Sequence, residues 1–168
     1  MASSRRLGLS ATAAAGVGGP ATGFGGTVEG VIGVASSVGV RLAAGLRAGS
    51  IAALPGTHFV ASLAGGVEWW HPGAGRWRLG LRGDVLLLRH QVTRIAAGDD
   101  ESMGRFVPGG DLVAGTALRL ASGFETLVGV GAELSFGTTE IRDGTAHVVV
   151  ATIPALRAIA QAGFRVAF

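Results

Sequence analysis

The sequence predicts an all-β protein with one domain over residues 1–168, an eight-stranded antiparallel up-and-down β-barrel. Apolar residues recur at every second position in eight segments, as they do in strands that expose two different faces. These segments run to about 11–15 residues, whereas a usual strand has about 5–6. The chain also holds 30 Gly, and each glycine inside a helix costs about 0.5–1 kcal/mol relative to alanine. Long strands are therefore favoured over long helices.

The first four strands show the alternation in chain order. They are expected at 6–17, 24–35, 38–48 and 58–70. In the first, Leu7 and Leu9 open an apolar face, and the opposite face is made of small residues. In the next three, Glu29, Arg41 and Glu68 lie on the face opposite to the bulky aliphatic residues. Each of these segments therefore has one apolar face and one small or charged face.

The last four strands repeat this pattern. They are expected at 76–90, 111–121, 124–138 and 155–168. The fifth is the clearest, because Trp77 and Leu79 alternate with Arg76 and Arg78. The eighth sets a run of apolar residues against Arg165 and small residues. The same two faces are thus predicted from the first strand to the last.

The connections between these strands alternate in length. Short turns are expected at 36–37, 71–75 and 122–123, and longer loops at 18–23, 50–57, 92–110 and 142–154. A tilted strand that crosses a bilayer needs about 9–11 residues. Long strands with short turns at one end and long loops at the other are typical of transmembrane β-barrels.

The charged residues favour a barrel with its polar face inside. An eight-stranded barrel has just enough interior space for side chains, so mixed charges and glycines would fill it as an ion-paired network. The expected lumen charges are Glu29, Arg41, Arg47, Glu68, Arg76, Arg78, Arg82, Asp84, Arg119, Glu125, Glu133, Arg157 and Arg165. The apolar face would then meet lipid. A soluble barrel with its apolar face inside is the alternative.

The aromatic residues avoid the middle of the expected strands. Two aromatic girdles that flank an aliphatic band mark the two interfaces of a bilayer. The expected interface residues are Phe24, Phe59, Trp69, Trp70, Trp77, Phe124, Phe136, Phe164 and Phe168. The chain has no Tyr, although girdles usually contain it.

Two of the short turns also predict strand register. If the turns centre on Gly73 and Ser122, they place four pairs of residues opposite each other. These pairs are Glu68 with Arg78, Trp69 with Trp77, Arg119 with Glu125, and Leu120 with Phe124. Opposite charges paired across strands stabilise a sheet by about 0.2–1 kcal/mol.

With eight amphipathic strands and a last strand that carries Phe164, Val166 and Phe168 at alternate positions, the sequence resembles small bacterial outer-membrane barrels of the OmpA/OmpX and OmpW-like group. The resemblance implies an integral outer-membrane protein with both termini in the periplasm. It also implies that the barrel-assembly machinery reads those three residues as its signal. Outer-membrane lipids would surround a monomer, and the long loops would carry any contact with an extracellular partner.

The expected function is a structural or surface-interaction role. A narrow porin-like channel for ions or small solutes is the alternative, because the expected lumen arginines outnumber the lumen carboxylates. An enzyme acting on lipid A is a lesser alternative. His58 and Ser62 are four residues apart along one strand, about 13 Å at ~3.3 Å per residue, too far for a catalytic pair. No enzymatic activity is expected.

Cofactors, metals and nucleic acid are not expected as ligands. The chain has no Cys, which excludes thiolate metal sites. The acidic residues Asp99, Asp100 and Glu101 lack the spacing of a calcium loop. The arginines recur singly inside apolar runs and form no basic patch for nucleic acid.

Overall fold

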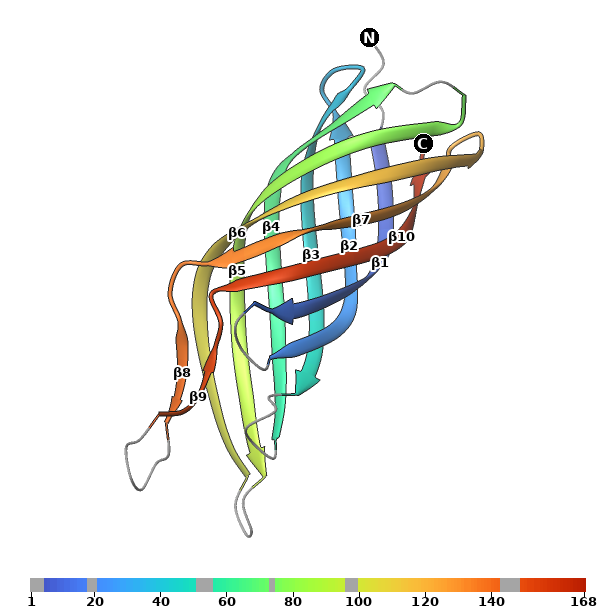
Figure 1. Ribbon diagram of the computed structural model, residues 1–168. Coiled ribbons are helices and arrows are strands. Elements are labelled where there is room, and N and C mark those ends of the chain that lie inside the picture. Colours follow the sequence, from blue (N-terminus) through green and yellow to red (C-terminus); the bar gives the residue numbers. More distant parts are fainter. Residues whose placement is uncertain (1–4, 18–20, 51–55, 73–74, 96–99, 143–148) are drawn as a thin grey trace.

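The computed structural model describes residues 5–17, 21–50, 56–72, 75–95, 100–142 and 149–168 (Figure 1). No helix in these segments is long and apolar enough to cross a membrane. The strands of the described residues are β1 (Arg5–Gly16), β2 (Thr22–Gly33), β3 (Val38–Ser50), β4 (Gly56–Pro72), β5 (Trp77–Ile95), β6 (Asp100–Ala121), β7 (Phe124–Ser135), β8 (Thr139–Arg142), β9 (Val149–Ile153) and β10 (Leu156–Ala167).

The predicted closed barrel is confirmed. Its strand order is β1-β10-β7-β6-β5-β4-β3-β2, every neighbouring pair is antiparallel, and β8 and β9 form a separate two-stranded sheet. The barrel closes where β1 pairs with β10, with Leu9 opposite Phe164. Both termini lie at one end, here called the terminal end, and the β8–β9 hairpin lies at the other, the distal end (Figure 1). Closure leaves no unpaired strand edge in the barrel wall.

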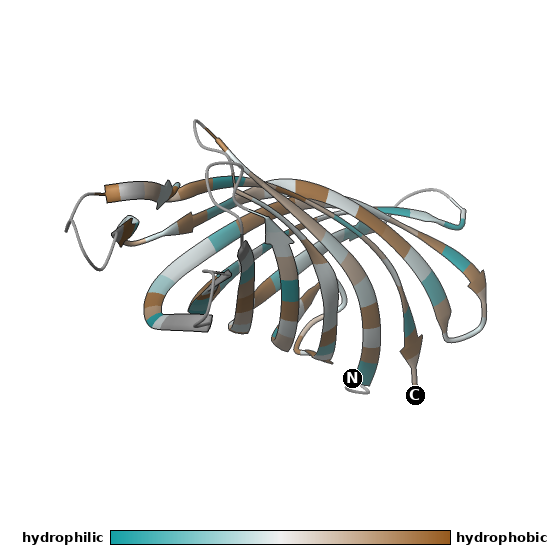
Figure 2. Cartoon of the chain, turned by 90° about the horizontal axis from the view of Figure 1, so that it is seen from below, coloured by the Kyte–Doolittle hydropathy of each residue, from teal (hydrophilic) through white to brown (hydrophobic). Residues whose placement is uncertain are grey.

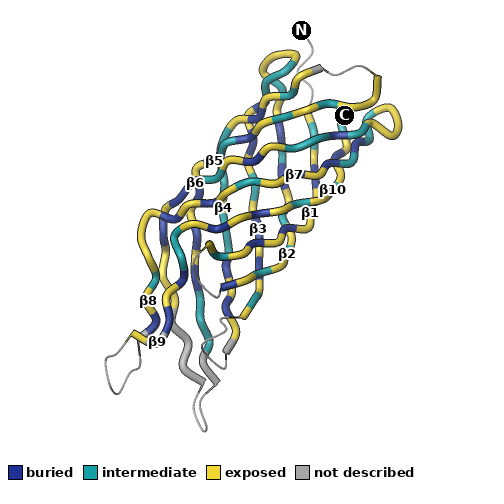
Figure 3. The backbone as a smooth tube through the Cα atoms, in the orientation of Figure 1, coloured by how far each residue is buried: buried dark blue, intermediate teal, exposed yellow. Residues whose placement is uncertain are grey.

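The two faces of the wall have the polarity expected of a barrel in lipid. Leu42 and Val85 on the outer face are 69% and 74% exposed, whereas Arg41 and Glu68 on the inner face are 2% and 1% exposed. Apolar and polar residues, and exposed and buried ones, alternate along the strands (Figures 2 and 3). Charges are buried and large apolar side chains are exposed, the reverse of a soluble barrel.

Inward-facing glycines make room for this crowded interior. A Cβ atom added at Gly66 would lie 2.1 Å from the carbonyl oxygen of Gly83, and one added at Gly163 would lie 2.3 Å from that of Leu9. Neither position accepts a side chain unless the backbone moves. Part of the high glycine content therefore follows from close approach of neighbouring strands.

The distal end contains more strand than the sequence predicts. The expected loop at 92–110 is wrong, because β5 continues to Ile95 and β6 begins at Asp100. The expected loop at 142–154 overlaps β8 and β9. Their ladder hydrogen bonds hold these strands together, but their sequence lacks a long apolar alternation. Apolar and polar residues alternate along a strand only where its two faces meet different surroundings.

The predicted register is partly right for one turn and wrong for the other. Arg119 does lie opposite Glu125, but a register shift then places Ala121, not Leu120, opposite Phe124. In the β4–β5 hairpin, Glu68 lies opposite Arg82 rather than Arg78, and Trp69 lies opposite Leu81 rather than Trp77. The reason is that β4 continues to Pro72 and the turn centres on Gly75, which has a φ of 76°. This shift is even, so every side chain keeps its predicted face.

Candidate functional site

The barrel lumen is the candidate site, and its larger part is a continuous chain of ion pairs near the terminal end. Arg165 on β10 donates hydrogen bonds to Glu29 on β2 and to Glu68 on β4, the latter at 3.0 Å. Glu29 also accepts a bond of 2.7 Å from the Nε of Arg41 on β3. All four side chains are at most 3% exposed. These contacts join four strands across the lumen.

The chain of pairs continues toward the middle of the barrel. Arg41 also pairs with Asp84 on β5. Arg82 lies 3.0 Å from Asp84 and 3.3 Å from Asp111 on β6, and donates a bond of 2.9 Å to Gln161 on β10. Arg41 therefore bridges two strands, and Arg82 contacts acceptors on three. A buried polar network of this kind rigidifies the wall and favours one arrangement of its strands.

A second cluster lies nearer the distal end. Glu133 on β7 lies between Arg47, at 2.6 Å, and Arg157, at 2.7 Å. Arg157 is 3.4 Å from the Nε2 of His90, whose Nδ1 is 3.4 Å from the Nε2 of His58. Both histidines are buried. Two arginines, one carboxylate and two imidazoles thus form a polar layer across the lumen.

Trp70 corrects the predicted aromatic girdle. Its ring faces the lumen, with the guanidinium carbons of Arg78 and Arg165 at 5.3 Å and 5.6 Å from the ring centroid. The preceding Trp69 faces outward and is 47% exposed. Two consecutive residues of a strand point to opposite faces, so only one of the pair can meet lipid. The sequence expectation grouped them by height along the barrel and ignored this alternation.

Two of the expected lumen arginines lie at the margin. Arg76 is exposed in the turn before β5, so its assignment to the lumen was wrong, because the strand begins only at Trp77. Arg119 is 56% exposed and lies 3.7 Å from Glu125. Glu125 pairs more closely with Arg78, which is only 14% exposed. The remaining expected charges, which the contacts above include, are buried or half-buried in the lumen.

Apolar side chains share the lumen with these charges. Val60, Leu86 and Leu88 form a buried cluster, and Val113 packs with Ala14 and Ile159 in another. Alternation predicts a uniformly outward apolar face, but the continuous run from Val85 to Leu88 must place two leucines inward. The lumen is therefore more tightly packed and less polar than the sequence indicates.

Two cavities in the described part of the lumen are small. One of about 40 Å³ lies between the two polar clusters, lined by side chains that include Arg41, Arg47 and Gln161. Another, of about 20 Å³, lies beside Trp70 and Arg165. A buried water needs about 10–15 Å³ of such space, so each cavity holds at most a few waters.

At the distal end, β8 and β9 contribute Ile141 and Ile153 to an apolar cluster that also contains Ala21 and Val92.

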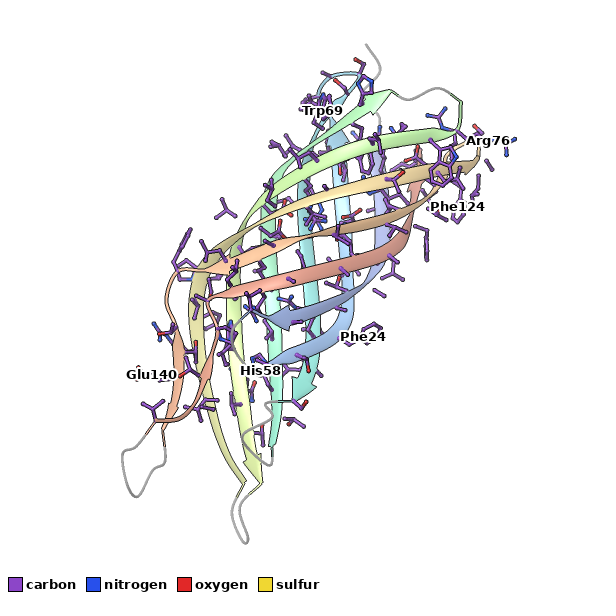
Figure 4. All side chains as sticks on the ribbon, in the orientation of Figure 1. Phe24, His58, Trp69, Arg76, Phe124 and Glu140 are labelled. Atoms are coloured by element: carbon purple, nitrogen blue, oxygen red, sulfur yellow. The ribbon has the colours of Figure 1, made fainter. Side chains whose placement is uncertain are left out.

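Of the other expected interface aromatics, Phe24, Trp69 and Phe124 lie on the outer surface (Figure 4), and the rest are exposed. At the terminal end, the rings of Phe124 and Phe164 lie in a tilted pair with centroids 6.0 Å apart, and Trp69, Trp77 and Phe168 are exposed. The residues nearer the distal end are Phe24, Phe59, Phe136 and, in addition, Phe106. This arrangement has the form of two girdles around an aliphatic band.

Several lumen residues were not among the expected charges. Arg6 on β1 lies 3.5 Å from Glu68, and Asp111 and Gln161 both contact Arg82. All three stand at inward positions of the alternation, which is the signal that identifies them. The contact between His58 and His90 has no such signal, because it depends on the register of β4 and β5.

The described residues contain no group of three or more His, Cys, Asp or Glu side chains placed to hold a metal. His58 contacts another histidine, and Asp84 is held by Arg41 and Arg82. The histidine considered for catalysis, His58, is therefore in contact with His90.

No protein-family model matches the sequence, and the search of curated proteins finds no match. Solved structures do resemble the fold. Neisserial surface protein A matches with a TM-score of 0.67 and 14% identity over 99% of this chain and 97% of that one. A major outer membrane protein of Thermus thermophilus matches with a TM-score of 0.67 and 15% identity over 100% of both chains. Ail of Yersinia pestis, in complex with the heparin analogue sucrose octasulfate, matches with a TM-score of 0.53 and 10% identity over 99% and 97%. The chain thus has the fold of small outer-membrane β-barrels.

Proposed function

We propose that this chain is an integral protein of the bacterial outer membrane with a structural or surface-interaction role and a closed lumen. The observation that carries the proposal is the inverted exposure of the wall. Charged residues such as Glu68 are buried inside, and leucines and valines cover the outside. Closed barrels can span lipid because every backbone group of the wall is paired.

Orientation is part of the proposal. The short turns of the β2–β3, β4–β5 and β6–β7 hairpins lie at the terminal end, while the long β5–β6 hairpin and the β8–β9 hairpin extend the distal end. Barrels of this kind have short periplasmic turns and longer extracellular loops. The terminal end is therefore assigned to the periplasm and the distal end to the cell exterior.

The packing of side chains in the lumen supports a closed barrel rather than a pore. The polar layer around Glu133 and the layer around Trp70 occlude the lumen at two levels, and the cavity between the two polar clusters has only about 40 Å³. The arginine surplus that favoured a pore is slightly reduced, since Arg6 replaces the exposed Arg76 and Asp111 adds a carboxylate. A structural or surface role needs no conduction path.

A surface-interaction role is the more specific half of the proposal. The Ail barrel, which shares this fold, is known in complex with a polysulfated sugar. In this chain the distal end presents Arg105, which is exposed and donates a bond of 3.1 Å to the carbonyl oxygen of Thr138. An extracellular ligand would meet this end first.

Assembly is proposed to depend on the last strand. Phe164 and Val166 point outward from β10, and the N–H of Phe168 donates to the carbonyl oxygen of Arg5 at 3.0 Å. The barrel-assembly machinery would read the three alternating side chains before the strand pairs with β1. A monomer is proposed, since one chain closes its own barrel.

Two measurements test the proposal. The purified protein should require detergent for solubility and should migrate differently on a denaturing gel before and after boiling. A protein that stays monomeric in buffer without detergent would contradict a membrane barrel. In planar bilayers, the refolded protein should give no stable conductance steps; stable, ion-selective steps would favour the pore instead.

A further inference from the structure

The outer wall of the barrel is hollowed on one side. Two adjoining hollows of about 740 Å³ and 730 Å³ lie over β2 to β5, and both are lined by Val28, Ala44, Leu63 and Leu87. Together they form one apolar groove on the face that the proposed function assigns to lipid. The groove forms because small residues, such as Ala44 and Gly65, occupy outward positions of β2 to β4.

The glycines of this groove differ from those of the lumen. A Cβ atom added at Gly26 would come no closer than 3.6 Å to another heavy atom, at Gly30 no closer than 3.8 Å, and at Gly65 no closer than 3.5 Å. These are ordinary contacts, whereas the lumen glycines Gly66 and Gly163 have no such space. Packing within the chain therefore explains the lumen glycines and leaves the groove glycines unexplained.

A guanidinium stands at the distal end of the groove. Arg89 lines it next to Phe106 and Ala61, its cross-strand neighbours. The guanidinium carbon of Arg89 lies 5.6 Å from the centroid of the Phe106 ring. Arg89 is outward-facing and exposed, at the level of the distal aromatic girdle. A cation at the membrane–water interface, beside the distal end of an apolar groove, is complementary to a lipid that has acyl chains and an anionic head group.

We propose that this groove is a binding site for one phosphorylated glycolipid of the outer leaflet, of the lipid A class. One acyl chain lies in the groove over β2 to β5, and a head-group phosphate accepts hydrogen bonds from Arg89, since the planar guanidinium suits a phosphate. This proposal rests on the proposed membrane location and orientation. The short side chains provide the space for the chain, and Arg89 selects the head group.

Native mass spectrometry tests the site in the full-length barrel refolded in a neutral detergent. The probes are diphosphoryl hexa-acyl lipid A and the same glycolipid without phosphates. The wild type should bind one molecule of the diphosphoryl form. Arg89→Gln should weaken that binding about tenfold, equivalent to about 1.4 kcal/mol, and should leave binding of the dephosphorylated form unchanged. Ala61→Leu, which fills the groove, should weaken binding of both forms.

Ala160→Leu on the outward face of β10 is the matched control, because Ala160 is exposed outside the groove. It should bind both probes as the wild type does. Equal affinity of all the variants, or binding that ignores the phosphates, would overturn the lipid site. A protein dimer that Ala61→Leu abolishes would also overturn it, in favour of a second copy. All variants should keep heat-modifiable migration; its loss in the wild type would contradict the proposed membrane barrel itself.

Discussion

Arg165 on β10 and Glu29 on β2 form a hydrogen-bonded ion pair across β1, directly over Gly8. A Cβ atom at Gly8 would lie 2.7 Å from the carboxylate of Glu29 and 2.9 Å from the Cγ of Arg165. The absence of a side chain at Gly8 thus lets two strands that are not neighbours connect through the lumen. This pair links the last strand to the second, beside the seam where the barrel closes.

Removal of Glu29 should destabilise the barrel strongly. In Glu29→Ala, Arg41 and Arg165 each lose one of two buried carboxylate partners, and breaking a buried ion pair costs up to about 3–5 kcal/mol. Urea-induced unfolding of the barrel in detergent micelles measures the change. Arg119→Gln is the control, because its 56% exposed side chain belongs to a class of pairs worth about 0–1 kcal/mol. Equal losses in the two variants would contradict a structural role for the buried network.

Glycines on the two faces of the wall should respond differently to alanine. Gly163→Ala places a Cβ atom 2.3 Å from the carbonyl oxygen of Leu9, and such overpacking costs about 1–3 kcal/mol. Gly26→Ala meets nothing closer than 3.6 Å and should be neutral or slightly stabilising. Thermal denaturation in one detergent compares the two variants. A reversed order would mean that the faces are assigned wrongly.

Loss of a buried ion pair from the polar layer around Glu133 should begin to open the lumen. The double variant Arg47→Ala with Glu133→Ala deletes a buried pair that lines the central cavity, and it leaves Arg157 without its carboxylate. We expect brief conductance events in planar bilayers from this variant and none from the wild type. Leu42→Ala on the outer face should behave as the wild type does. Equal conductance of all three proteins would place the barrier elsewhere.

The last aromatic residue should matter for assembly in cells more than for the stability of the barrel. Phe168 is 71% exposed, so Phe168→Ser removes little packing within the chain. We expect reduced insertion into the outer membrane but normal refolding in detergent. Deletion of residues 1–4 should leave insertion unchanged. Equal insertion of both variants would count against the assembly signal.

The alternation of the sequence was sufficient to predict the barrel, its closure and the inward position of most charges. It could not predict the ion-pair partners of these charges. Glu68 on β4 contacts Arg165 on β10, for example, and this contact depends on the register of every strand between them. A turn two residues later along the chain changed the partner of Glu68 but not its face. Trp70 was misassigned for a different reason. The prediction placed Trp69 and Trp70 in the same girdle, although consecutive residues of a strand point to opposite faces and Trp70 lies beside Arg165 in the lumen.

The three tryptophans provide the most direct measurement of the inverted wall. Trp69 and Trp77 point outward and Trp70 points into the lumen. Variants that keep one tryptophan each, with the other two changed to phenylalanine, are refolded into vesicles of phosphatidylcholine with brominated acyl chains. Bromine should quench the fluorescence of Trp69 and Trp77 strongly and that of Trp70 weakly. Equal quenching of all three, or stronger quenching of Trp70, would contradict a lipid-facing apolar wall around a polar lumen.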